Sequence, residues 1–217
     1  MNKRLVVFDL DGTLITGNTW EDFNKAMGIT QEQDQKLYDA FKCGTITHYE
    51  WDIELIRLYN LDQNKHSKEQ VLDYLTQYKI KEDAYAALAE INETAHDTLL
   101  LTGSFQITAD AVGFELGIKD SIATNTCVFD NQGMLVDIES QGDQQHAKVT
   151  KLREFCTRRN ISLDDCMVIG DGDNDKELFK VAGHSVTFGN SDKLSKELAD
   201  HTIQSLTELP DLLSQLD

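Results

Sequence analysis

The chain has 217 residues, is 40% hydrophobic and carries a formal net charge of −18 at pH 7. This length and apolar content predict a globular protein with one sizeable core and room for an inserted subdomain. The acidic excess argues against nucleic acid or an anionic membrane as a partner, because such partners need clustered Lys and Arg. A small anionic substrate stays compatible with the charge, since a metal ion and a few donors can reverse the potential locally.

The cysteines and the first residues bear on the compartment. The four cysteines stand at positions 43, 127, 156 and 166, and no two of them have a CxxC spacing. The apolar run after the basic start stops at Phe8, which is too short for a signal peptide or a membrane span. We therefore expect a soluble, cytoplasmic protein that needs no disulfide bonds, with a monomer or a homodimer both open.

The predicted elements begin with a buried strand over 4–10, which ends in a Gly turn. Helical patterns then follow almost throughout, over 20–28, 31–44, 48–60 and 68–79. Thr30, Thr47 and Ser67 are the expected N-caps of the last three helices, and Gln70 adds a capping box to Ser67. With no convincing strand among them, these helices predict a small helical subdomain.

From residue 81 onward, strands and helices alternate. We predict helices over 81–95, 105–117, 144–160, 175–183 and 193–200, strands over 97–104, 166–172, 184–190 and 201–206, and a hairpin over 123–139. This order is typical of an α/β protein with a Rossmann-like, mainly parallel sheet flanked by helices. We expect residues 1–14 and 81–217 to form this core, with 15–80 as an inserted α-helical cap.

Two acidic loops follow predicted strands, "DLDG" from Asp9 and "GDGDND" around Asp171. A calcium EF-hand loop is excluded for the second, because Lys176 and Ala182 stand where Gly and Glu are needed. The acidic residues can also be explained as caps of the next helix. If the two strands are neighbours, however, their carboxylates converge, and Asp9, Asp11 and Asp171 with waters would suit Mg²⁺.

Four motifs in this order resemble those of the haloacid dehalogenase-like phosphohydrolases. "FDLDGTL" (8–14) is similar to the first motif, DxDx[TV], and "LLLTGSF" (99–105) to the second, a strand that ends in Ser or Thr. Lys148 matches the lysine of the third motif, and "GDGDND" (170–175) resembles the fourth, GDGxND. A helical cap between the first two motifs is similar to that of the phosphoserine phosphatase branch.

The resemblance implies a role for each matching residue. Asp9 would be the nucleophile that forms an aspartyl-phosphate, and Asp11 the general acid and then the general base. Thr102 and the amide of Gly103 would hold the phosphate oxygens, and Lys148 would neutralise charge. Thr102 can also be explained as a turn residue, and a helical lysine as solvated.

The same resemblance implies a magnesium site. Asp9 and Asp171 would bind Mg²⁺ directly, the backbone carbonyl of Asp11 would add a ligand, and Asp175 would orient the metal's waters. Asn174 could reach the phosphate or the motif lysine. Asp173 occupies the variable position of the fourth motif, so the resemblance implies no catalytic role for it.

The substrate-binding positions depart from the phosphoserine phosphatase pattern. Asn18 stands where that branch has a glutamate that helps to bind the substrate's amino group, and a neutral amide pairs with an ammonium less strongly. Arg57 would stand in for the arginine that recognises a carboxylate, or it is an ordinary surface arginine. Phosphoserine is therefore one candidate among several phosphomonoesters.

We expect a Mg²⁺-dependent phosphomonoester hydrolase that acts on a small phosphorylated metabolite through Asp9. One alternative is a phosphotransferase that passes the phosphoryl group to an alcohol, since both reactions share the first half. Another is a catalytically silent protein that keeps the fold. The intact set of Asp9, Asp11, Lys148 and Asp171 argues against the silent protein.

Overall fold

The architecture is a seven-stranded sheet with helices on both faces. The computed structural model describes residues 3–216, without the side chains of Gln144 and Asp173. The strand order is β6-β5-β4-β1-β7-β8-β9, and all neighbours are parallel except β5 and β6. The strands are β1 (Leu5–Phe8), β4 (Asp97–Phe105), β5 (Asp120–Phe129), β6 (Leu135–Ser140), β7 (Cys166–Ile169), β8 (His184–Phe188) and β9 (His201–Ile203). The predicted α/β, mainly parallel fold is confirmed.

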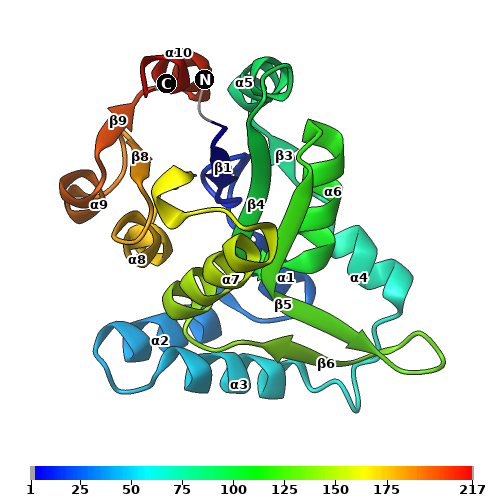
Figure 1. The fold of residues 1–217 in the computed structure, drawn as a ribbon. Coiled ribbons are helices and arrows are strands. Elements are labelled where there is room, and N and C mark those ends of the chain that lie inside the picture. Colours follow the sequence, from blue (N-terminus) through cyan, green and yellow to red (C-terminus); the bar gives the residue numbers. More distant parts are fainter. Residues whose placement is uncertain (1–2, 217) are drawn as a thin grey trace.

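Strand β1 lies in the middle of the sheet and is buried on both faces (Figure 1). Val6 and Phe8 pack into one helical layer, while Leu5 and Val7 pack into the other. The first layer contains α5 (Glu82–Asn92), α6 (Gln106–Leu116) and α10 (Leu209–Leu216), and the second contains α7 (Gln144–Arg159), α8 (Lys176–Phe179) and α9 (Lys193–Leu198). Burial on both faces explains why this strand is continuously apolar rather than alternating.

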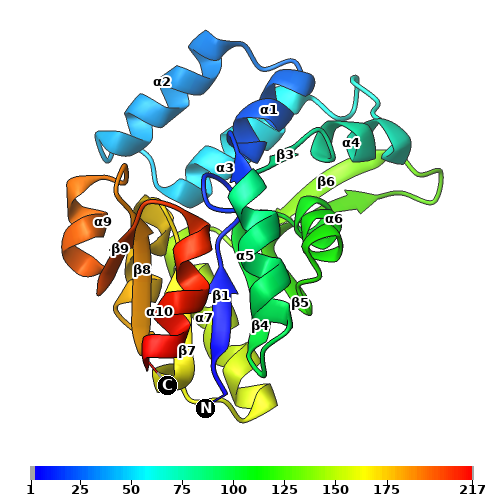
Figure 2. The same cartoon turned by 90° about the horizontal axis from the view of Figure 1, so that it is seen from above.

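The inserted helices lie at the carboxyl end of the parallel strands, opposite the start of β1 (Figure 2). They are α1 (Thr19–Ala26), α2 (Gln31–Lys42), α3 (His48–Tyr59) and α4 (Lys68–Leu75). Short strands β2 (Ile15–Thr16) and β3 (Lys79–Ile80) pair with each other, so both ends of the insertion lie side by side. Apolar residues of α1, α3 and α4 form one cluster with the β5–β6 hairpin.

The predicted N-caps of this segment are confirmed. The side chains of Thr30, Thr47 and Ser67 each accept a hydrogen bond from the backbone of the third helical residue. In each case Gln or Glu at that third position reaches back to the capping residue, so all three helices begin with a capping box.

Some elements differ from the prediction. The helix expected over 175–183 is a 3₁₀ turn at Asp173–Asp175 followed by the single-turn α8. The two-residue strands β2 and β3 were not predicted, because a pair of residues carries no periodicity. Helix α10 was also missed, although its apolar residues lie on one face.

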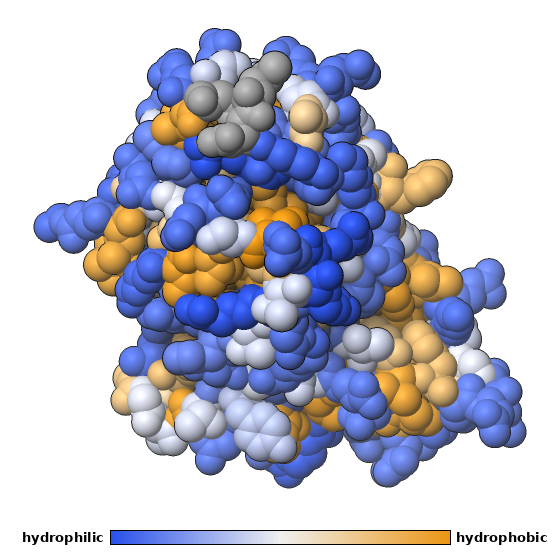
Figure 3. Space-filling model, in the orientation of Figure 1, coloured by the Kyte–Doolittle hydropathy of each residue, from blue (hydrophilic) through white to orange (hydrophobic). Residues whose placement is uncertain are grey.

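The residues on the surface differ in hydropathy. The face in Figure 3 is largely hydrophilic, with apolar groups scattered between polar ones. Within residues 3–216, no helix combines the length and the apolar content that crossing a bilayer requires.

Candidate active site

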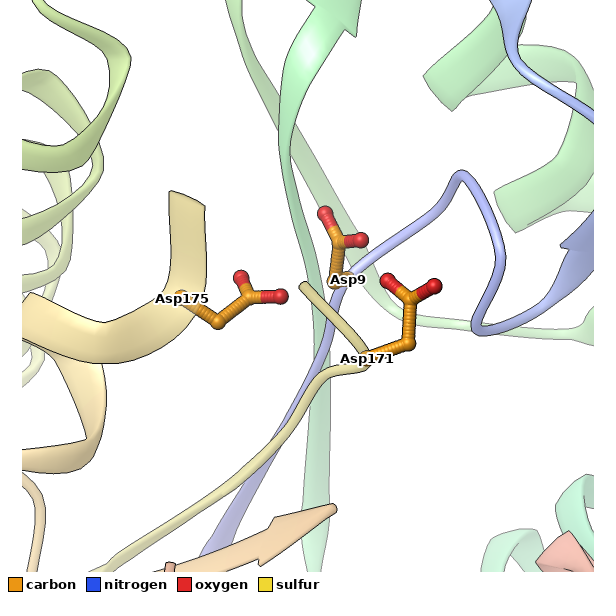
Figure 4. A group of neighbouring side chains, drawn as sticks. All are labelled: Asp9, Asp171 and Asp175. Carbon is orange, nitrogen blue, oxygen red and sulfur yellow. The ribbon is translucent and has the colours of Figure 1, made fainter. Parts of the chain in front are cut away.

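Three carboxyl groups lie together where β1 and β7 end (Figure 4). Phe8 pairs with Ile169 in the parallel register of these strands, so the residues that follow both strands leave the sheet at the same edge. The ligand oxygens of Asp9, Asp171 and Asp175 all lie within 4.8 Å of one another. The two strands are neighbours, which was the condition for their carboxylates to converge.

Glycines allow the loops to approach this closely. Gly12 has a φ of +74°, and a Cβ built on it would lie 2.0 Å from Asp171 Oδ2. A Cβ on Gly170 would lie 2.3 Å from Asp175 Oδ2. Any larger residue at either position would displace a carboxylate, which explains the glycines of "DLDG" and "GDGDND".

Lys148 from α7 lies inside the acidic group. Its side chain is fully buried, and its ammonium donates to Asp9 Oδ1 at 2.6 Å and to Asp175 Oδ1 at 2.7 Å. Burial alone would lower the pKa of Lys148, but the two carboxylates, Asp175 first, raise it above its ordinary value. Lys151, three residues further along the same helix, lies 3.9 Å from Glu154 instead.

The carboxylates are not fully neutralised by this lysine. Burial, and then the charge of Asp175, raises the pKa of Asp9 well above its ordinary value. The same two causes raise the pKa of Asp171 to about 6. Asp9 Oδ2 is buried and has no hydrogen-bond partner among the described residues. Repelling carboxylates and an unpaired buried oxygen form a donor set that fits a hard divalent cation.

Asp11 has different surroundings from the other acidic residues. Its Oδ1 accepts hydrogen bonds from the amide of Thr19, at 2.7 Å, and from the Thr19 hydroxyl. Burial raises the pKa of Asp11, although the bonds from Thr19 act in the opposite direction. A carboxyl group whose protonated form is favoured suits a general acid. No sequence pattern indicated Thr19, which begins α1.

The second motif lies at the end of β4, next to β1. Thr102 is buried, and its hydroxyl accepts a hydrogen bond from the amide of Ser104 at 3.0 Å. The register between β4 and β5 shifts between Thr102 and Phe105, so Gly103 and Ser104 lie in a bulge. Thr102 and Gly103 therefore lie near the end of β4, the strand next to β1, and Asp9 directly follows β1.

The other predicted site residues are less directly placed. Asn174 is half-buried in the 3₁₀ turn beside Asp175. Asn18 is exposed and caps α1, because its side chain accepts from the amides of Trp20 and Glu21. A local signal for this cap exists, since Asn is a favoured N-cap residue and acidic residues follow in the first turn.

Within the described residues, Arg57 forms no hydrogen bond or ion pair with the carboxylates of the site. Its side chain is 72% exposed and forms an ion pair with Glu54 on the same helix. A cavity of about 290 Å³ lies beside the carboxylates, lined by Asp171, Gly172, Asn190, Ser191 and Asp192. Arg57 is absent from this lining.

One further lysine was not anticipated from the sequence. The Lys81 ammonium donates to the Gly12 carbonyl and lies 4.9 Å from the centre of the Phe188 ring. Its charge also opposes the rise in the pKa of Asp171. Lys81 directly follows β3, which pairs with β2. Its contact with the loop that contains Gly12 therefore depends on where β3 leads the chain back to the core.

Comparison with known proteins adds the family. A family model for haloacid dehalogenase-like hydrolases matches residues 25–209. The chain belongs to this family.

Relatives and solved structures agree with this assignment. The chain is 24% identical over 211 residues to a phosphoserine phosphatase of Methanocaldococcus jannaschii, with 93% of this chain and 92% of the relative covered. It is 28% identical to a phosphoserine phosphatase of Albidiferax ferrireducens, covering 93% and 85%. A substrate-bound phosphoserine phosphatase structure superposes with a TM-score of 0.78 at 24% identity, covering 99% of both chains. The predicted resemblance to the phosphoserine phosphatase-like branch and the predicted enzyme class, a phosphatase, are confirmed.

Proposed function

We propose that this hydrolase is a Mg²⁺-dependent phosphomonoester hydrolase that forms an aspartyl-phosphate on Asp9. The observation that carries the proposal is the environment of this carboxylate. One Asp9 oxygen is held by Lys148, the other is buried with no hydrogen-bond partner in the described part of the chain, and Asp171 lies beside it. A nucleophile with one oxygen oriented by a cation and one left free suits attack on phosphorus.

The proposed metal ligands are Asp9 and Asp171, together with the backbone carbonyl of Asp11. Asp175 would orient the metal's waters, since one of its carboxylate oxygens lies within 4.8 Å of oxygens of Asp9 and Asp171. When bound, Mg²⁺ would neutralise these carboxylates and polarise a phosphoryl oxygen. The convergence of Asp9 and Asp171 supports this set, because burial and the charge of Asp175 raise the pKa of both carboxyl groups, and a divalent cation between them would offset that repulsion.

The remaining residues would act on the substrate. Asp9 attacks phosphorus, and Asp11 donates its proton to the leaving oxygen. Asp11 then takes a proton from the water that hydrolyses the aspartyl-phosphate. The Thr102 hydroxyl and the Gly103 amide hold the non-reacting oxygens, while Lys148 offsets the charge shared by the phosphoryl group and Asp9.

We propose a small, soluble phosphorylated metabolite as the substrate, with residues 15–80 as a cap over the site and 1–14 and 81–217 as the core. Phosphoserine is a candidate because several relatives are phosphoserine phosphatases. Asn18 is neutral and caps α1, so it cannot form an ion pair with the ammonium of phosphoserine. Arg57 is exposed, pairs with Glu54 and is not among the residues that line the cavity beside Asp171. Other phosphomonoesters are therefore equal candidates. We propose that Asn174 contacts the phosphate of whichever substrate binds.

The test is hydrolysis of a generic aryl phosphate with and without Mg²⁺. We expect turnover that needs the metal and is lost in Asp9→Asn. Undiminished turnover in Asp9→Asn would overturn the mechanism. Adding an alcohol acceptor and analysing the products separates the two reaction types, because a new phosphorylated product that rivals free phosphate would indicate a phosphotransferase.

A further inference from the structure

Asn125 makes side-chain contacts with the second-motif loop. This residue of β5 is only 1% exposed. Its side-chain NH₂ group donates to the carbonyl oxygens of Gly103, at 2.8 Å, and Ser104, at 3.2 Å. The same group lies 3.1 Å from the Thr124 hydroxyl. Two of the three acceptors therefore belong to the backbone of the loop.

The bulge in β4 explains why a side chain is needed there. Thr102 pairs with Ala123 and Phe105 pairs with Asn125, so two residues of β4 oppose a single residue of β5. An extra residue in one strand interrupts the ladder of backbone hydrogen bonds. The Asn125 side chain supplies donors to the carbonyls inside this interruption.

Trp20 donates to the same carbonyl from the inserted segment. Its indole N–H lies 3.0 Å from the Gly103 oxygen, and its ring packs against Phe105 with centroids 4.4 Å apart. The Gly103 carbonyl therefore receives one donor from the sheet, through Asn125, and one from α1. These two donors fix the direction of one peptide group.

The direction of that peptide group determines the next contact in the loop. In a trans peptide, the Gly103 C=O and the Ser104 N–H lie in one plane and point in opposite directions within it. The Ser104 N–H donates to the Thr102 hydroxyl at 3.0 Å. Holding the Gly103 carbonyl thus also holds the hydroxyl that is proposed to bind a phosphate oxygen.

We propose that Asn125 and Trp20 are positioning residues that orient the Gly103–Ser104 peptide, and through it Thr102, toward the phosphoryl group. The inference rests on the proposed function. Asn125 Oδ1 is buried without a hydrogen-bond partner among the residues described. Burying Asn125 Oδ1 without a partner costs free energy. The hydrogen bonds from the Asn125 NH₂ group to the Gly103 and Ser104 carbonyls offset that cost.

The test compares Asn125→Ala and Trp20→Phe with a matched control, Asn92→Ala. The Asn92 amide also donates to a backbone carbonyl, Leu116 O at 3.0 Å, and its Oδ1 is likewise buried and unpaired, but it lies between α5 and α6. Trp20→Phe keeps an aromatic ring while it removes the N–H donor. For each protein we would measure kcat and KM on an aryl phosphate at saturating Mg²⁺, inhibition by inorganic phosphate, and the melting temperature.

We expect kcat/KM to fall about 10- to 100-fold in Asn125→Ala and about 3- to 10-fold in Trp20→Phe, with weaker inhibition by phosphate in both. Asn92→Ala should lower the melting temperature while its kinetics stay within about twofold of the wild type. Kinetics of Asn125→Ala that match those of Asn92→Ala would overturn the inference.

The remaining outcomes are also decisive. If Asn125→Ala does not fold, unchanged kcat/KM and phosphate inhibition in Trp20→Phe would overturn the inference instead. A wild-type protein without activity on any phosphomonoester contradicts the proposed function itself, and the inference falls with it. An active wild type with unaffected variants contradicts only the positioning role.

Discussion

Gly12→Ala is the substitution that separates the proposed metal site from the rest of the fold most sharply. The new Cβ would lie 2.0 Å from Asp171 Oδ2, whereas ordinary contact begins at 3.4 Å. The Asp171 carboxylate must therefore retreat by about 1.4 Å, which exceeds the roughly 0.2 Å tolerance of metal–ligand distances. We expect the Mg²⁺ concentration for half-maximal activity to rise about 10- to 100-fold.

The substitution also strains the backbone, because Gly12 has a φ of +74°. That strain should destabilise the protein by about 1–2 kcal/mol and lower its melting temperature by about 2–8 °C. Gly133→Ala is the matched control, since Gly133 has a φ of +76° and no atom within 4 Å of a built Cβ. It should lose the same stability and keep the wild-type response to Mg²⁺. A Mg²⁺ titration of Gly12→Ala that coincides with that of Gly133→Ala would refute the reasoning.

Three further substitutions test individual residues. Lys148→Met leaves Asp9 and Asp175 buried without their shared cation, which should destabilise the metal-free protein by about 3–5 kcal/mol at neutral pH in denaturant titrations. The pKa of Asp9 in the folded protein already lies above its value in the unfolded chain, and it rises further in this variant, so folding takes up a proton. The loss of stability is therefore complete above the folded-state pKa of Asp9. It shrinks as the pH falls toward the pKa of Asp9 in the unfolded chain. A loss that grows on acidification would contradict this sign. Arg57→Ala should change KM for an aryl phosphate and for phosphoserine by less than about twofold, because the side chain is 72% exposed; a tenfold higher KM for phosphoserine would place it on the substrate. Asp171→Asn should bind Mg²⁺ more weakly, so that excess Mg²⁺ recovers part of the rate, and a lack of rescue at any concentration would argue against a ligand role.

Local patterns predicted the elements that position the carboxylates. The apolar run before Asp9 predicts a buried strand, and the run before Asp171 predicts a second one. Because parallel neighbours end at the same edge, the sequence also predicted that these residues would meet if the two strands were neighbours, a condition that only the structure could supply. The N-caps of α2, α3 and α4 followed from Thr30, Thr47 and Ser67, since capping depends on residues only three positions apart.

Contacts between distant segments could not be predicted in this way. Thr19, Lys81 and Asn125 each bond to a loop of the site, yet none belongs to a motif. Their roles depend on the path of the insertion and on the bulge in β4, neither of which has a sequence period. The exposure of Arg57 likewise depends on which face of α3 packs against the core, a property of tertiary packing.

The central claim is that Asp9 forms a covalent bond to phosphorus. The most direct measurement is acid quenching of the enzyme during turnover of an aryl phosphate with Mg²⁺, followed by mass spectrometry of its peptides. We predict a phosphoryl group on the peptide that contains Asp9, present only with Mg²⁺ and substrate and absent from Asp9→Asn. Turnover without any phosphorylated peptide, or with the phosphoryl group on another residue, would contradict the account.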